Sequence, residues 1–184
     1  MKIETAAILG GAEFKKGDKE YQDAFEVSKI LAQGGITVFN GGGPGIMRAS
    51  TQGAHEGGGR VISVTYYPEY QHANFEGRDQ GNLFDEEIIT DNYFARTQKL
   101  LEMGGIHVIF RGGSGTISEF GMSWALSRIH DGHNKPIILF GGFWRYIIES
   151  LQEYMYLRPG ETKLYDVVDE ASQITPLIEK YRRA

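Results

Sequence analysis

The sequence predicts an α/β protein with a Rossmann-like fold, in which a doubly wound parallel sheet carries helices on both faces. Three observations predict it. Short apolar runs, several of them rich in β-branched residues, alternate with patterns of helical spacing along the chain. Glycine clusters follow three of these runs, where parallel strands would turn into helices. Glycine also accounts for 25 of the 184 residues, roughly twice its usual share. Because strands that alternate with helices need crossover connections, we expect the strands to be parallel.

The N-terminal half begins with a small apolar run, Thr5 to Leu9, which ends in Gly10-Gly11 and predicts the first strand. Asp18 then precedes apolar residues at helical spacing, and Gly34-Gly35 closes that helix as a C-terminal cap would. The same order of strand, glycine turn and helix follows again. The remaining predicted elements of this half are strands over 36–39, 60–66 and 86–90 and helices over 46–56 and 92–103, with a rim loop over 68–85 that is rich in Pro, Asn, Gly and charge.

The C-terminal half contains the glycine turn around which the predicted site is built. Ile106 to Phe110 is short and apolar and predicts a buried strand. The turn 111–118 follows this strand, and a helix is predicted from Glu119 to Ile129. Further strands are predicted over 135–140 and 164–168, and further helices over 143–156 and 175–183, the last with Pro176 in its first turn, where proline is tolerated.

Length and composition indicate a single globular domain over residues 1–184. Apolar residues make up 41% of the chain, charged residues 23%, and the net charge is −5. Lys and Arg form no basic stripe, and Arg182-Arg183 at the tail is only a pair of charges, so no nucleic-acid partner is expected. There is no cysteine, which excludes a disulfide framework, a thiolate metal site and a cysteine nucleophile. No apolar run approaches the length of a signal core or a membrane span, and a cytoplasmic protein without membrane contact is expected.

Three glycine clusters lie at predicted carboxyl ends of strands, where ligands of parallel sheets bind. They are Gly10-Gly11, Gly41 to Gly45 and Gly112 to Gly115. Glycines can simply close tight turns, but three clusters at one edge favour a shared ligand site. At a strand-to-helix turn, the first N–H groups of the helix and the positive end of its dipole point outward and attract an anion. The predicted substrate-binding residues are Gly10, Gly11, Gly42, Gly43, Gly112, Gly113, Ser114, Gly115 and Thr116.

The motifs narrow the kind of anion. The dinucleotide fingerprint G-x-G-x-x-G fails, because the segment that starts at Gly113 ends in Ser118 and no acidic residue ends a strand about 20 residues on. No Gly-Lys pair occurs, which excludes a Walker A loop. NAD and ATP-driven phosphoryl transfer are therefore disfavoured. A site for a single phosphate remains, held by N–H groups and the Thr116 hydroxyl, and no resident cofactor is expected.

Two motifs resemble those of a known family. The segments 41–47 (GGGPGIM) and 112–119 (GGSGTISE), with Arg96 upstream, are similar to the LOG family of cytokinin riboside 5′-monophosphate phosphoribohydrolases. The members of this family were long mislabelled as lysine decarboxylases. The resemblance runs from the first strand to about Phe140. In the family, an arginine and the glutamate of P-G-G-x-G-T-x-x-E lie 23 positions apart, and Arg96 and Glu119 keep that spacing.

The resemblance implies hydrolysis of the N-glycosidic bond of nucleoside 5′-monophosphates, such as AMP or cytokinin ribotides, to free base and ribose 5-phosphate. It assigns the reaction to Arg96 and Glu119 as catalytic residues and implies a homodimer or higher homo-oligomer. The transition state of this reaction resembles an oxocarbenium ion, which a carboxylate stabilises while it positions or deprotonates water. Arg96 would hold the ribose or phosphate and orient the glutamate.

The sequence departs from the family pattern at three positions. Arg111 replaces the leading proline of the motif, Thr97 replaces the lysine after the catalytic arginine, and Ser118 replaces the first residue of a Glu-Glu pair. The loss of the lysine removes a positive charge near the expected nucleotide. These departures favour an alternative function, in which the same glycine turns bind a nucleotide or a phosphorylated cofactor without chemistry, as the similar molybdenum cofactor carriers do.

Several interpretations of single residues stay open at this point. Thr116 and Glu119 also fit a capping box, in which the glutamate would bond to the backbone at the helix start. Tyr93 and Phe94 could stack on a base or belong to the core. His130 and His133 could suggest a metal, although a loop with two histidines and no third ligand is usually only a loop. A pyridoxal phosphate decarboxylase would need a lysine Schiff base, which no motif marks.

Overall fold

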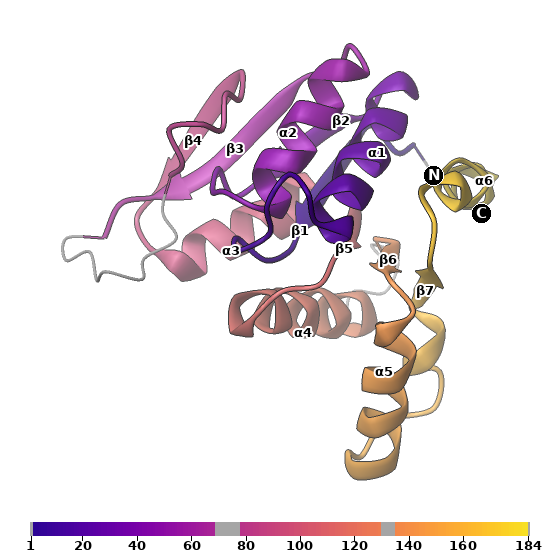
Figure 1. Cartoon of the computed structure of the whole chain (residues 1–184). Helices are drawn as coiled ribbons and strands as arrows, with labels where there is room; N and C mark the ends of the chain where they lie inside the picture. The colour runs from indigo at the N-terminus through magenta and orange to yellow at the C-terminus, as the bar shows by residue number, and fades with distance from the viewer. Residues whose placement is uncertain (1, 69–77, 130–134, 184) are drawn as a thin grey trace.

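The computed structural model describes residues 2–68, 78–129 and 135–183. Its centre is one sheet of seven strands in the order β4-β3-β2-β1-β5-β6-β7, and every neighbouring pair is parallel. This is the doubly wound α/β architecture that the sequence predicts (Figure 1). The strands are β1 Thr5–Leu9, β2 Thr37–Asn40, β3 Val61–Tyr66, β4 Glu86–Thr90, β5 Ile106–Ile109, β6 Ile137–Phe140 and β7 Tyr165–Val168.

The helices cover both faces of the sheet, because successive strand residues point to opposite sides. In β1, Ala6 and Ile8 pack in the core beneath α1, α2 and α6, whereas Ala7 and Leu9 pack in the core beneath α3, α4 and α5. The helices are α1 Lys19–Gln33, α2 Ile46–Glu56, α3 Tyr93–Met103, α4 Ser114–Ile129, α5 Phe143–Tyr154 and α6 Ile174–Arg183, with short 3₁₀ helices at η1 Glu161–Lys163 and η2 Ala171–Gln173.

The direction of winding reverses between β1 and β5, which are neighbours in the sheet although about 100 residues separate them. The turns that follow these two strands lie side by side. The Phe110 amide donates to the Leu9 carbonyl at 2.8 Å, and the Gly11 amide donates to the Arg111 carbonyl at 2.9 Å. The first and third glycine clusters therefore meet at the carboxyl edge of the sheet, as expected.

The bounds of β1, α2 and β4 agree with the sequence-based predictions, and most other elements differ by one or two residues. The largest difference is at α4. This helix is expected to begin at Glu119 but begins at Ser114, so residues 114–118 of the predicted turn already belong to the helix. Glycine and serine are weak helix formers, which explains why the pattern did not reveal the earlier start.

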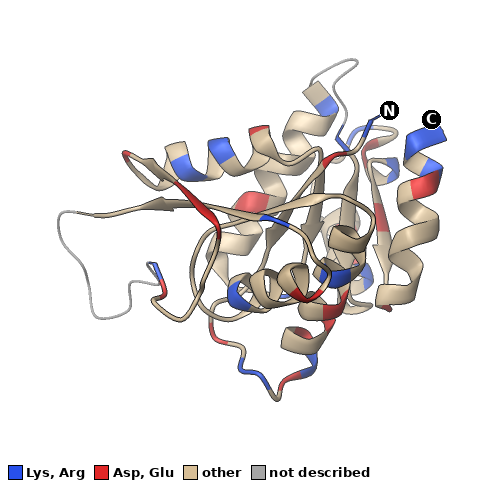
Figure 2. Cartoon of the chain, turned by 90° about the horizontal axis from the view of Figure 1, so that it is seen from above, with Lys and Arg blue, Asp and Glu red and all other residues tan. Residues whose placement is uncertain are grey.

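Charged residues of both signs are interspersed over the molecule (Figure 2). Several form exposed pairs, among them Arg145 with Asp169 at 2.8 Å and Lys180 with Asp166 at 3.1 Å. Exposed pairs of this kind contribute little to stability. Within the three described ranges, no helix combines the length and the apolar character needed to cross a bilayer.

Candidate functional site

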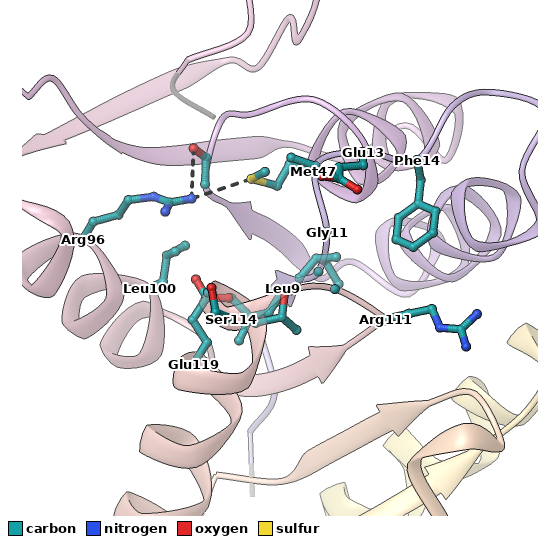
Figure 3. A pocket seen from close by; sticks show the side chains of 18 of the residues that line it. Leu9, Gly11, Glu13, Phe14, Met47, Arg96, Leu100, Arg111, Ser114 and Glu119 are labelled. Atoms are coloured by element: carbon teal, nitrogen blue, oxygen red, sulfur yellow. Dashed lines mark hydrogen bonds between the residues drawn. The ribbon is translucent and has the colours of Figure 1, made fainter. Parts of the chain in front are cut away.

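A cavity of about 770 Å³ opens at the carboxyl edge of the sheet, above the reversal between β1 and β5 (Figure 3). Its size is within the range of about 300–1,000 Å³ that is typical of small-molecule sites. The turns after β1, β2 and β5 form its walls together with α3 and the first turns of α4. The lining residues are Ile8, Leu9, Gly10, Gly11, Ala12, Glu13, Phe14, Gly41, Met47, Tyr66, Tyr93, Arg96, Leu100, Arg111, Gly112, Gly113, Ser114, Gly115, Thr116 and Glu119.

The N-terminus of α4 faces this cavity. Gly113 precedes the helix, and the first bond back to it comes from the Ile117 amide at 3.1 Å. The N–H groups before Ile117 have no partner within the helix and carry the positive end of its dipole. Position 112 requires glycine because neighbouring atoms leave no space for a side chain. A Cβ there would lie 2.1 Å from Thr116 Oγ1 and 2.7 Å from the Gly11 nitrogen. The turn therefore offers a polar surface that suits an anion.

Glu119 lies in the second turn of α4, and its side chain reaches the cavity (Figure 3). It is 6% exposed. Burial raises the pKa of its carboxyl to about 7, against the opposing effect of the nearby Arg96 guanidinium. Among the residues that the structure describes, none hydrogen-bonds to this carboxylate. The capping-box interpretation is wrong, because Thr116 is the third residue of the helix instead of the residue before it.

Arg96 extends from α3 over the carboxyl ends of β2 and β3 (Figure 3). Its Nε donates to the Val64 carbonyl at 3.2 Å, and its Nη2 donates to the Gly41 carbonyl at 3.4 Å. Nη2 also lies 3.7 Å from the sulfur of Met47. These contacts hold the guanidinium over the same cavity that Glu119 enters, so the two residues expected from their spacing are brought together.

The second glycine turn, residues 41–45, lies mostly behind the cavity wall and supports it. Of its glycines only Gly41 lines the cavity, and a Cβ there would lie 1.7 Å from Arg96 Nη2. Gly42 and Gly43 are buried behind this wall and are not among the lining residues. The Gly42 carbonyl accepts from the Asp79 amide at 3.0 Å, and the Gly43 carbonyl accepts from Asn82 Nδ2 at 2.8 Å. Seven of the nine predicted substrate-binding residues do line the cavity: Gly10, Gly11, Gly112, Gly113, Ser114, Gly115 and Thr116.

Asn40, at the end of β2, fixes the shape of this turn. Its Oδ1 accepts from the Gly42 amide at 2.8 Å, and its Nδ2 donates to the Met47 carbonyl at 3.1 Å. Gly45 has φ +62°, and a Cβ there would lie 2.4 Å from the Gly11 carbonyl oxygen. That carbonyl accepts from the Ile46 amide at 3.0 Å, which ties the second glycine turn to the first.

The three departures from the family pattern occupy different environments. Thr97 is fully buried and is not among the lining residues of the cavity. Ser118 Oγ donates to the Gly115 carbonyl at 2.7 Å and lies 2.8 Å from the Tyr93 hydroxyl. Arg111 lines the end of the cavity away from Arg96 (Figure 3) and pairs with Glu20 at 3.1 Å.

Sequence reasoning missed several lining residues, including Tyr66, Glu13, Phe14 and Met47. Tyr66 could have been found, since it is the last residue of a predicted strand and thus stands at the ligand edge. The two aromatic candidates separate in the structure. Tyr93 lines the cavity, whereas Phe94 is 75% exposed and belongs neither to the cavity wall nor to the buried core.

Metal ligation is the remaining question for the site. Over residues 2–68, 78–129 and 135–183, no group of three or more His, Asp or Glu side chains is placed to hold a metal ion. His130 and His133, considered as ligands from the sequence, lie outside the described residues.

Comparison with known proteins gives the site a family context. The model of the SLOG cluster4 family matches residues 4–163. An uncharacterized protein of Archaeoglobus fulgidus is 28% identical over 142 residues, which cover 77% of this chain and 87% of that protein. A cytokinin riboside 5′-monophosphate phosphoribohydrolase of Arabidopsis thaliana is 22% identical over 152 residues, or 79% of this chain and 63% of that protein.

Among solved structures, the molybdenum cofactor binding protein of Rippkaea orientalis superposes with a TM-score of 0.73 over 98% of both chains, at 18% identity. This likeness confirms the fold.

Proposed function

The chain belongs to the SLOG cluster4 family, and we propose that it hydrolyses the N-glycosidic bond of nucleoside 5′-monophosphates, releasing free base and ribose 5-phosphate. The observation that carries the proposal is Glu119, a buried carboxyl with a pKa near 7 that shares a cavity with Arg96 and with the N-terminus of α4. Strongly perturbed carboxyls in clefts are typical of catalytic sites. The Arabidopsis relative, which is named for this reaction, adds support.

Each part of the cavity has a role in this reaction. The N–H groups at the start of α4 bind the 5′-phosphate. As the bond from C1′ to the base nitrogen breaks, the base leaves with the electron pair and takes up a proton from solvent, and positive charge develops on the sugar. Glu119, as the carboxylate, stabilises that charge and accepts a proton from the water that adds to C1′. Arg96 holds the ribose or phosphate, and its own position is fixed by the carbonyls of Val64 and Gly41.

The test is a panel of purine and pyrimidine nucleoside 5′-monophosphates, cytokinin ribotides included, incubated with the pure protein and analysed for free base by chromatography. Wild-type protein should release base from at least one of them. Glu119→Gln should abolish release while the protein stays folded. If no substrate releases base even at high protein concentration, hydrolysis is rejected.

A second function is favoured by the departures from the phosphoribohydrolase pattern and by the structural likeness to a molybdenum cofactor binding protein. Arg111 adds a cation to the cavity wall at the position where the LOG motif has proline. The same site would then bind a nucleotide or a phosphorylated cofactor without cleaving it. Ligand-dependent thermal stabilisation with no product in the chromatographic assay supports this carrier function, and turnover contradicts it.

We also propose a homodimer, supported by apolar side chains that α4 and α5 expose. Ile117 and Ile129 of α4 and Tyr146 and Tyr154 of α5 are all more than 60% exposed. Exposed apolar surface of this kind commonly marks an interface, and most soluble oligomers are symmetric. Sedimentation equilibrium should give twice the chain mass for wild type. A monomer mass at micromolar concentration contradicts the dimer.

A further inference from the structure

Two tyrosines form an aromatic corner at the Arg96 end of the cavity. Tyr66 is the last residue of β3, and Tyr93 is the first residue of α3. Their ring centroids lie 6.3 Å apart with an interplanar angle of 73°, an edge-to-face arrangement. Both residues line the cavity. A planar ligand that enters this corner can stack on the ring of one tyrosine while its edge contacts the ring of the other.

The orientation of Tyr93 is fixed by contacts with α4. Its hydroxyl lies 2.8 Å from Ser118 Oγ and 3.4 Å from the Gly115 carbonyl. Ser118 lies where the LOG pattern has an acidic residue, and it makes a neutral hydrogen bond with the Tyr93 hydroxyl. Because the hydroxyl is engaged at α4 and the backbone is part of α3, the ring bridges the two helices and presents a rigid apolar wall.

The aromatic corner adjoins the groups assigned to the reaction. Tyr93 and Arg96 are three residues apart on α3, a spacing that places side chains on the same helix face. Ser118, which contacts Tyr93, directly precedes Glu119 on α4. In a nucleotide the base is joined to C1′, so a base in this corner would set the scissile bond beside the Arg96–Glu119 pair.

The opposite end of the cavity has a different character. Arg111 lies there, its guanidinium carbon 5.0 Å from the centroid of the Phe143 ring and its Nη1 3.1 Å from Glu20. The α4 N-terminus lies between the two ends. The cavity therefore has the aromatic corner and Arg96 at one end, Arg111 with Phe14 and Glu13 towards the other, and the N–H groups of the α4 start between them. This order leaves room for a base in the aromatic corner while the phosphate meets the N–H groups.

We propose that Tyr66 and Tyr93 form the base subsite, which selects ligands that carry a planar aromatic base over bare sugar phosphates, with Ser118 as the residue that positions Tyr93. This subsite rests on the proposed nucleotide function. Base–aromatic stacking contributes enough binding energy that losing one ring weakens binding by about tenfold or more. The interaction tolerates different bases, because every base has a π-face.

The test compares AMP with ribose 5-phosphate, which lacks the base, by calorimetric titration in a Glu119→Gln background that prevents turnover. Tyr93→Leu and Tyr66→Leu should each weaken AMP binding by about tenfold and leave ribose 5-phosphate binding within about twofold. Tyr93→Phe keeps the ring but loses the hydroxyl contact with Ser118, so its AMP affinity should lie between those of wild type and Tyr93→Leu, and Ser118→Ala should show the same partial loss. Phe94→Leu is the matched control, since this exposed ring, 6.2 Å from Tyr93, does not line the cavity.

Unchanged AMP binding in both leucine variants overturns the subsite. An equal loss of AMP and ribose 5-phosphate binding also overturns it, because it would indicate general damage to the cavity. Failure of the hydrolysis proposal gives a different result, namely AMP binding that depends on the tyrosines without any base release by the wild type. If neither AMP nor ribose 5-phosphate binds, both proposals are rejected.

Discussion

Replacing Glu119 by glutamine should make the protein more stable at neutral and alkaline pH while removing its activity. Glu119 is 6% exposed and receives no hydrogen bond from the described part of the chain, so its charge is poorly solvated in the folded state. In the unfolded chain the same carboxylate is fully hydrated. Glutamine has nearly the same shape, carries no charge and loses no existing hydrogen bond. A buried charge that lowers stability in this way is typical of functional sites.

The size and sign of this effect follow from the pKa of Glu119, which burial raises from 4.5 to about 7. Between these values the folded protein binds more protons than the unfolded chain, so the stability of the wild type falls as pH rises through the window. The difference corresponds to about 3 kcal/mol above pH 7, at 1.36 kcal/mol per pKa unit. For a chain of this length, that amounts to an increase in Tm of roughly 6–12 °C for the variant.

The assay is thermal and urea unfolding of wild type and Glu119→Gln at several pH values between 4 and 8.5. The stability gain of the variant should be near zero at the acid end, grow through the window and level off above pH 7. Glu153→Gln, which changes an exposed residue of α5, is the matched control and should show no such trend. A gain that does not vary with pH, or no gain at pH 8, would refute the account of Glu119 as a poorly solvated carboxyl.

Four further predictions follow from the same structure. Base release should rise about tenfold per pH unit below pH 7 and level off above it, because the carboxylate form of Glu119 is required; initial rates that fall over this range would contradict its role as a base. Gly41→Ala should lower base release by about 100-fold, since the added Cβ would lie 1.7 Å from Arg96 Nη2 and must displace the guanidinium; unchanged rates in a folded variant would show that Arg96 need not be held there. Thr97→Val should raise the free energy of unfolding by about 1 kcal/mol, because the buried hydroxyl has no partner within the described residues; urea titration measures this, and a loss of stability would reveal a missing contact. Gly121→Ala, at an exposed position inside α4 with no atom within 4 Å of the added Cβ, should gain about 0.5–1 kcal/mol in the same titration.

Much of the fold could be predicted because the hydrophobic pattern of each segment matches the burial of that segment in the folded protein. The strands at the centre of a parallel sheet are buried on both faces, so Ile106–Ile109 and Ile137–Phe140 appear as unbroken apolar runs. Glycine clusters mark where such runs end, which located three turns at the edge where ligands bind. The spacing of Arg96 and Glu119 was likewise visible in the chain, and the structure places both side chains in one cavity.

Other features depended on contacts between segments far apart in the sequence. Gly42 and Gly43 resembled ligand-binding glycines, but the segment that carries Asp79 and Asn82 covers them. Thr97 stood where a ligand-facing residue was expected, yet the rotation of α3 directs it into the core. The start of α4 was also hidden, because Ser114, Gly115 and Thr116 of its first turn are weak helix formers.

The sequence by itself determined the alternation of strands and helices, the edge of the sheet that carries the site and the two residues assigned to its chemistry. The elements and the glycine turns follow from periodicity and from the backbone freedom of glycine, which are local properties, whereas Arg96 and Glu119 were assigned from the resemblance to the LOG family. The tertiary structure decided how those residues can act. It buried Glu119 without a hydrogen bond from the residues that the structure describes and moved its pKa towards 7, and it held Arg96 against backbone carbonyls of β3 and of the turn after β2. It also set Tyr66 beside Tyr93. Burial and proximity of this kind depend on how the whole chain packs.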